Sequence, residues 1–246
     1  MSGFEKYSKI FINRASEVIH EQDFKTKFPE VFTNKLLGLS GPKQLITKET
    51  PSNIFFSKLF HGFQEIFDSY HCLLDIAIYI GRFPYSNTPI SKTRHLAYHM
   101  ENYLNEVYIL KMRLNSYFTI LGRLYRKDRR HQEILKRTKA LFSFVNNALT
   151  GIIDTRGSHI HKTRFNDEDI DQLSYQEFFS VHGGDEFQII TNLFKTDYRK
   201  VKKKYKVTVQ NNNEQIKKIL DGCFDMLYEI VVDKNGQIKY PELEKT

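Results

Sequence analysis

The sequence has few of the residues that build cross-linked or membrane-spanning proteins. Its two cysteines, Cys72 and Cys223, both lie in apolar helical patterns, which excludes a disulfide framework or a cysteine-based zinc site and is typical of a reducing compartment. The longest apolar stretches, such as residues 72–80, are interrupted by Asp75 and are too short to span a bilayer. Residues 1–6 show no apolar core of a signal peptide. We therefore expect a soluble cytoplasmic protein without a membrane partner.

Segments with strand character are also scarce, because outside the carboxyl-terminal tail only Val207-Thr208-Val209 has it. Apolar residues instead recur at spacings of three and four, which predicts an all-α fold, namely an up-and-down helical bundle with extra flanking helices. We expect one domain over residues 1–246, with a core at 54–182 and flanking segments at 1–53 and 183–246. The expected helices span residues 4–21, 29–37, 54–81, 92–123, 128–153, 167–179, 185–206 and 215–232, with Asn211-Asn212-Asn213 as a turn between the last two.

Several catalytic motifs are missing. The sequence has no Gly-x-Ser-x-Gly elbow and no glycine-rich loop followed by Lys-Ser or Lys-Thr, which argues against serine hydrolases and P-loop NTPases. His95 and His99 share a helix face and offer two metal ligands, but the glutamate of His-Glu-x-x-His is absent, so two surface histidines are the favoured interpretation. The lysine cluster at residues 200–206 suits either phosphate contacts or, more commonly, a solvated helix face.

Positive charge is concentrated in the middle of the chain. Residues 91–165 carry 15 basic and 5 acidic side chains, a net charge of +10, whereas the whole chain has +8. A basic field of this kind attracts polyanions and accelerates association with them, although it does not distinguish nucleic acid from an acidic protein or membrane surface.

The basic segment ends in a dense polar stretch, Asp154-Thr155-Arg156-Gly157-Ser158-His159-Ile160-His161-Lys162-Thr163-Arg164. An arginine presents a planar, permanently charged fork to phosphate oxygens, and a histidine exchanges protons near neutral pH. Together they supply what metal-free RNA cleavage needs, a proton carrier for attack by the 2′-hydroxyl and a cation for the charge that develops on phosphorus. The alternative is a polar helix end whose cations favour the helix dipole.

Arg156-Gly157-Ser158-His159-Ile160-His161 fits Arg-x-x-x-x-His, the short form of the motif of the HEPN superfamily, which contains small helical nucleases and RNA-binding proteins. Residues 99–114 and 159–171 also resemble one branch of this superfamily, and the resemblance covers about residues 54–182. It implies a bundle that dimerises with the motifs of two chains facing each other, as a metal-independent endoribonuclease without cofactor. By this resemblance Arg156 stabilises the phosphate and the transition state and His161 acts as general acid or base. Ser158, His159, Lys162 and Arg164 would support RNA binding, and a toxin-like role would add an antitoxin or other protein partner.

Helix geometry leaves alternatives open. Arg156 and His161 would lie roughly 140° apart on an unbroken helix, whereas Arg156 and His159 would share a face. Either the helix is distorted near Gly157 or the two residues meet partners from a second chain, and we favour the dimer. A non-catalytic module that binds RNA or protein is the main alternative, because Gly157 stands where the family usually has a polar residue beside the arginine. A helical structural protein is the third.

Overall fold

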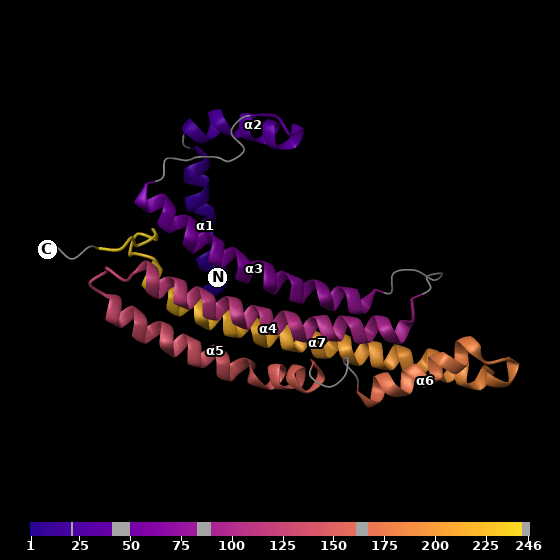
Figure 1. Ribbon diagram of the computed structural model, residues 1–246. Helices are drawn as coiled ribbons and strands as arrows, with labels where there is room; N and C mark the ends of the chain where they lie inside the picture. The colour runs from indigo at the N-terminus through magenta and orange to yellow at the C-terminus, as the bar shows by residue number, and fades with distance from the viewer. Residues whose placement is uncertain (21, 41–49, 83–89, 161–166, 243–246) are drawn as a thin grey trace. The chain divides into compact units, whose positions relative to one another are not determined.

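The computed structural model describes residues 1–20, 22–40, 50–82, 90–160 and 167–242, and most of these residues are helical. For residues 18–20, 22–28, 35 and 154–160 it describes the backbone alone. Within these ranges no strand forms, which confirms the all-α prediction (Figure 1). The helices are α1 (Gly3–His20), α2 (Gln22–Leu37), α3 (Pro51–Gly81), α4 (Lys92–Leu124), α5 (His131–Ile160), α6 (Glu168–His182), the short 3-10 helix η1 (Asp185–Phe187) and α7 (Gln188–Val231).

Two predicted boundaries are wrong. The short helix expected at residues 29–37 begins earlier, at Gln22. Residues 211–213 were expected to form a turn, but α7 continues through them without interruption for 44 residues. The Asn213 side chain is 4% exposed, and its amide donates to the Leu73 carbonyl of α3 at 3.0 Å while its oxygen accepts from the Tyr103 hydroxyl of α4 at 3.1 Å. Packing of this kind outweighs the weak preference of asparagine for turns.

The chain divides into two compact units, each built from segments that are distant in the sequence. Unit 1 contains residues 1–64, 116–141 and 219–246, and unit 2 contains residues 65–115 and 142–218. Since α3, α4, α5 and α7 all cross these boundaries, each unit takes part of every long helix. No helix in the described ranges has both the length and the apolar character needed to cross a membrane.

Unit 1 has an aromatic core. Phe4, Tyr7 and Phe11 of α1 bury their rings against Phe63 of α3, with ring centroids 4.9–5.6 Å apart. The Tyr7 hydroxyl lies 2.7 Å from that of Tyr117 in α4, so the one polar atom of each buried ring has a partner. A side chain at Gly62 would meet the Tyr117 ring at 2.7 Å, which explains why α3 has a glycine there.

A buried carboxylate organises the connection between α4 and α5 in unit 1. Asp128 accepts hydrogen bonds from the backbone N–H, Nε and Nη2 of Arg130 at 2.7–3.0 Å. It also accepts from the backbone N–H of Glu242 at 3.1 Å, while the Tyr125 hydroxyl donates to the Lys239 carbonyl at 2.6 Å. The carboxyl-terminal segment is thereby fixed against the end of α4.

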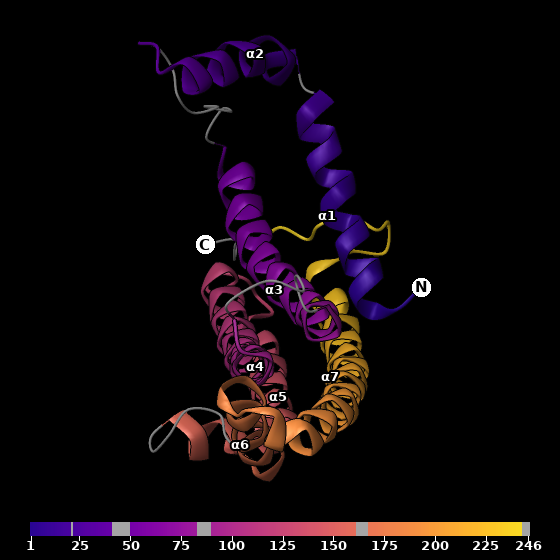
Figure 2. The ribbon, with the colours of Figure 1, turned by 90° about the vertical axis from the view of Figure 1, so that its right-hand side faces the viewer.

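Unit 2 joins its helices through polar contacts around an apolar core. The views in Figures 1 and 2 place α3, α4 and α7 side by side, and Asn213 bonds to both other helices. The start of α6 is held to α7, because the Tyr205 hydroxyl donates to both oxygens of Asp167, at 2.6 and 2.7 Å, and Lys204 pairs with Asp169. These bonds hold the segment that directly follows the predicted motif.

Candidate functional site

The predicted motif lies at the carboxyl end of α5. The backbone of this helix continues through Gly157 to Ile160, so α5 does not end at that glycine. Arg156, Ser158 and His159 therefore occupy its last turns, although their side chains are not described. His161, Lys162 and Arg164 lie outside the described residues. Which of these side chains meet therefore stays a prediction.

The residues that flank the motif on its carboxyl side are well anchored. Asp167 caps α6, with its side chain accepting from the backbone N–H of Ile170 at 2.9 Å. This cap confirms the acidic N-cap signature expected from the sequence. Because Asp167 also accepts from Tyr205 of α7, only six residues, 161–166, connect the end of α5 to a fixed point on α7.

The lysines of α7 fall into two groups on different faces of that helix. Lys200 pairs with Asp197 at 3.4 Å and Lys204 pairs with Asp169, so their charges are neutralised locally. Lys202 and Lys206 share another face, because they are four residues apart, and none of the ion pairs within the described ranges includes either of them. The sequence alone suggested a uniform solvated face, whereas the structure separates neutralised lysines from lysines whose charge remains available.

Lys202 belongs to a larger cationic group. The ring of the buried Tyr198 has the Nζ atoms of both Lys92 and Lys202 at 5.8 Å from its centroid, which is within the range of a cation–π interaction. The pKa of Lys202 is lowered by burial and by its neighbours Lys206 and Lys92. The ammonium group of Lys202 therefore lies close enough to those of Lys92 and Lys206 to be repelled by both.

A carboxylate beside the start of α4 already has other partners. Glu177 of α6 accepts from the Ser91 hydroxyl at 2.5 Å and from the backbone N–H groups of Lys92 and Thr93 at 2.7 and 3.1 Å. It thus satisfies the start of α4, where a helix favours negative charge. Because these three donors occupy the Glu177 carboxylate, it does not neutralise the lysine side chains, and an external anion could still bind them.

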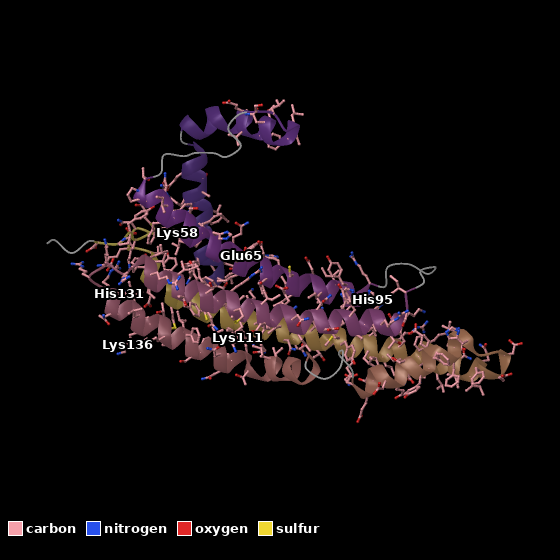
Figure 3. The ribbon with its side chains drawn as sticks, in the orientation of Figure 1. Lys58, Glu65, His95, Lys111, His131 and Lys136 are labelled. Atoms are coloured by element: carbon pink, nitrogen blue, oxygen red, sulfur yellow. The ribbon has the colours of Figure 1, made fainter. Side chains whose placement is uncertain are left out.

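Aromatic rings surround the two histidines predicted to share a face. The rings of His95 and His99 are 4.5 Å apart, and the His99 ring lies 5.6 Å from Tyr79 and 5.4 Å from Tyr98. His95, labelled near the start of α4 in Figure 3, is 9% exposed, and burial followed by His99 and Lys202 lowers its pKa to about 4. Burial also lowers the pKa of His99. Among the described residues no group of three or more His, Cys, Asp or Glu side chains gathers as metal ligands.

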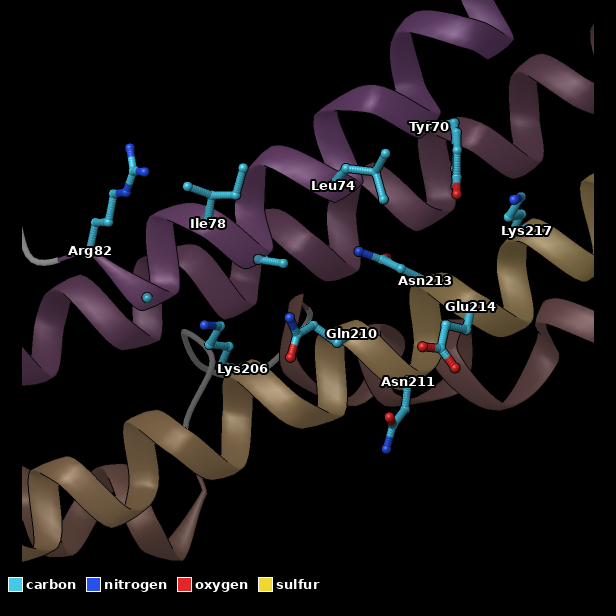
Figure 4. A pocket seen from close by; sticks show the side chains of 12 residues that line it. Tyr70, Leu74, Ile78, Arg82, Lys206, Gln210, Asn211, Asn213, Glu214 and Lys217 are labelled. Atoms are coloured by element: carbon cyan, nitrogen blue, oxygen red, sulfur yellow. The ribbon is translucent and has the colours of Figure 1, made fainter. Parts of the chain in front are cut away.

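A cleft of about 640 Å³ opens between α3 and α7, and Lys206 lies on its wall (Figure 4). The side chains of Lys206, Gln210 and Asn213 extend from α7 toward α3, whose residues Leu74 and Ile78 give the cleft an apolar side. The Lys206 side chain runs past Gly81, where an added Cβ would contact it at 3.7 Å. The cleft therefore combines cations, amides and apolar surface.

Comparison of the chain with family models, curated proteins and solved structures finds no match.

Proposed function

We propose that the protein is a metal-independent endoribonuclease of the HEPN type, with a composite site at a homodimer interface. The observation that carries the proposal is the Arg156-x-x-x-x-His161 motif at the carboxyl end of a long helix in an all-α chain, at the end of its most basic segment. Arginine and histidine supply phosphate binding and proton transfer without a metal.

The proposed reaction is an internal transfer at phosphorus. A histidine removes the proton of the 2′-hydroxyl, and the 2′-oxygen attacks the adjacent phosphorus while the bond from phosphorus to the 5′-oxygen breaks. A second histidine gives its proton to the leaving 5′-oxygen, which yields a 2′,3′-cyclic phosphate and a 5′-hydroxyl. Arg156 stabilises the charge on the phosphorane. Because the reaction needs a base and an acid together, two copies of His161 from two chains suit it.

The helical backbone of α5 favours a site shared between chains. A regular helix that includes position 161 would point Arg156 and His161 roughly 140° apart, and α5 stays helical through Gly157 as far as Ile160. Arg156 and His159 would lie on one face of such a helix. His159 is therefore the residue to compare with His161 in any test of the histidine's role.

A non-catalytic RNA-binding module is the second candidate, and Gly157 is the observation that favours it. A glycine beside Arg156 offers no side chain to orient the guanidinium. In such a module Arg156 would contact phosphate, and neither histidine would transfer a proton. The two candidates share an RNA ligand and differ in turnover.

Cleavage of labelled RNA by purified protein in EDTA tests the proposal. We expect cyclic-phosphate products from the wild type and a loss of about a hundredfold or more in rate for Arg156→Ala and for His161→Ala. His159→Ala should retain most activity. Matched controls are Lys139→Ala on the exposed face of α5 and His61→Ala on α3, both exposed, which should leave the rate unchanged.

Three results would count against the nuclease. Cleavage that survives in both motif variants would remove the motif from catalysis, and activity lost in EDTA would remove the metal-free mechanism. Salt-dependent RNA binding without turnover, weakened by Arg156→Ala and indifferent to His161→Ala, would establish the binding module instead.

A further inference from the structure

We infer that unit 2 carries a second RNA-contacting surface, separate from the motif, which binds single-stranded RNA through Lys92, Lys202 and Lys206 and stacks bases on Tyr79 and Tyr98. The choice of RNA rests on the proposed function, whereas the surface itself follows from contacts among described residues. Single-stranded nucleic acid is recognised by cations that track the backbone together with aromatic rings that stack on bases.

The cationic half of the surface is a group of lysines that the fold leaves without carboxylates. Lys200 and Lys204, on another face of α7, form ion pairs with aspartates. Burial, and after it the charges of Lys206 and Lys92, lower the pKa of Lys202. Bringing like charges together costs free energy, and a phosphate bound between them would offset that cost.

The lysines also have fixed positions, which a binding site requires. The Nζ atoms of Lys92 and Lys202 both lie 5.8 Å from the ring centroid of Tyr198, which is 8% exposed. Since Tyr198 is held in the core, it keeps the two ammonium groups near one another from different helices. Lys206 passes along Gly81 at the carboxyl end of α3, where a cation is also favoured by the helix dipole.

The aromatic half consists of two exposed tyrosines. Tyr79 and Tyr98 are 50% and 60% exposed, and each has a ring within 5.6 Å of His99. His99 contacts His95, on whose pKa the charge of Lys202 acts. Two exposed phenol rings from α3 and α4 are thus connected to the lysine group through the histidine pair. The lowered pKa of both histidines keeps them uncharged at neutral pH, so they contribute ring surface rather than charge.

The cleft between α3 and α7 continues the surface. Lys206 lines it together with Arg82 and Lys217, and the amides of Gln210 and Asn211 offer donors and acceptors (Figure 4). Glu214 is the carboxylate in its lining. In the proposed complex a strand of nucleotides places phosphates on Lys202 and Lys206, and Lys206 connects this strand to the cleft. A duplex hides its base faces, so the surface suits a single strand.

The test compares two double variants of α7 that remove the same charge at the same spacing. Binding of a fluorescent single-stranded RNA of about 12 nucleotides is measured by anisotropy across a salt series, in the His161→Ala background so that cleavage does not interfere. We expect Lys202→Gln/Lys206→Gln to weaken binding about tenfold or more at low salt and to reduce the slope of log affinity against log salt by about 1.4. Lys200→Gln/Lys204→Gln should stay within about twofold of the parent.

The tyrosines are tested separately. Tyr79→Ala and Tyr98→Ala should each weaken single-stranded RNA binding by about fivefold or more without changing the salt slope, because stacking involves no counterion release. Tyr175→Ala, on α6 and 71% exposed, is the matched control and should bind as the parent does. Duplex RNA should be insensitive to all three tyrosine variants.

The outcomes separate this surface from the proposed nuclease. Equal weakening by both lysine pairs would show a diffuse charge effect and overturn the inference, as would unchanged binding in all variants. Binding that depends on Lys202 and Lys206 in a protein that never cleaves RNA would refute the nuclease and keep the surface. Normal cleavage and an unchanged KM in Lys202→Gln/Lys206→Gln would refute the surface and keep the nuclease. Tighter binding of single-stranded DNA than of RNA would overturn the choice of RNA.

Discussion

At the scale of single residues, Asp128 shows how a charge is held inside this protein. Its side chain is fully buried beside Arg130. Burial opposes its ionisation, but the hydrogen bonds from the Arg130 side chain and backbone and from the Glu242 backbone outweigh that cost and lower its pKa to about 2. An ion pair with complete hydrogen bonding is stable in such a place, and removing one partner is costly.

The lowered pKa of Asp128 predicts how the stability of unit 1 changes as the pH falls. Between the ordinary value of 3.8 and about 2, the unfolded chain binds a proton that the folded chain does not, so stability rises with pH in that window. The contribution of Asp128 is therefore complete above pH 4 and is lost as the pH falls toward 2. We expect Asp128→Asn to lower the free energy of unfolding by about 2 kcal/mol at pH 7.

Urea unfolding of the wild type and Asp128→Asn at several pH values measures this difference. It should shrink toward zero near pH 2, because the protonated aspartic acid then resembles asparagine. Asp68→Asn, at an exposed position of α3, is the control and should change stability little at any pH. A difference that stays constant down to pH 2 would show that shape, and not charge, matters at position 128.

At the scale of elements, α7 is a helix that was poorly predicted from the sequence. Asparagine runs are typical of turns because the side chain competes for backbone hydrogen bonds. In the structure Asn213 directs that same side chain to Tyr103 and to the Leu73 carbonyl, so α7 joins α3 and α4 at one point. A buried amide with both ends bonded favours one register of three helices over others.

The two interpretations of Asn213 predict opposite signs. If it were a turn residue, alanine would favour helix and stabilise the protein slightly. Because it is bonded and buried, we expect Asn213→Ala to destabilise by about 1–3 kcal/mol, since the Tyr103 hydroxyl loses its acceptor. Asn211→Ala, at an exposed position two residues away, should be neutral or stabilising by a few tenths of a kcal/mol.

Thermal and urea unfolding of these variants measures the change in stability. A double-mutant cycle with Tyr103→Phe shows how much of that change comes from the hydrogen bond between Tyr103 and Asn213. Removing both polar groups should cost less than the sum of the two single changes, because no buried hydroxyl is then left unsatisfied. Additive costs would mean that the pair does not interact.

The long helices were predictable because their apolar residues repeat at helical spacing for many turns. Leu96, Val107 and Leu114 of α4, for example, are all fully buried as expected. The i, i+4 spacing likewise brought His95 and His99 together. The lysines of α7 were different, since Lys204 pairs with Asp169 only because α6 packs there, whereas Lys200 pairs with Asp197 of its own helix. Sequence spacing tells which residues share a face but not what that face meets. Which histidine joins Arg156 also stays a prediction, because those side chains are outside the described part of the chain.

At the scale of the whole molecule, charge and assembly act against each other. Each chain carries a net charge of +8, so two chains repel at low ionic strength, whereas RNA is attracted. A nuclease that needs two chains per site therefore has two opposite salt responses. Raising salt should strengthen dimerisation and weaken RNA binding.

This opposition predicts how activity depends on concentration and on mixing. If catalysis needs residues 156 and 161 from two chains, activity per chain should fall when the protein is diluted below the dissociation constant of the dimer. Sedimentation in the absence of RNA should show a dimer fraction that rises as salt is added from about 0.01 M to 0.15 M, over which the Debye length falls from about 30 to 8 Å. Excess His161→Ala chains should lower wild-type activity, because mixed dimers contain one complete motif.

Activity per chain that is independent of dilution and unaffected by added His161→Ala chains would place a complete site within one chain. Arg156 would then need its histidine on the same helix face, which is the position of His159 and not of His161. His159→Ala would become the inactivating substitution, and Lys139→Ala, on the same helix, would remain the control for the substitution itself.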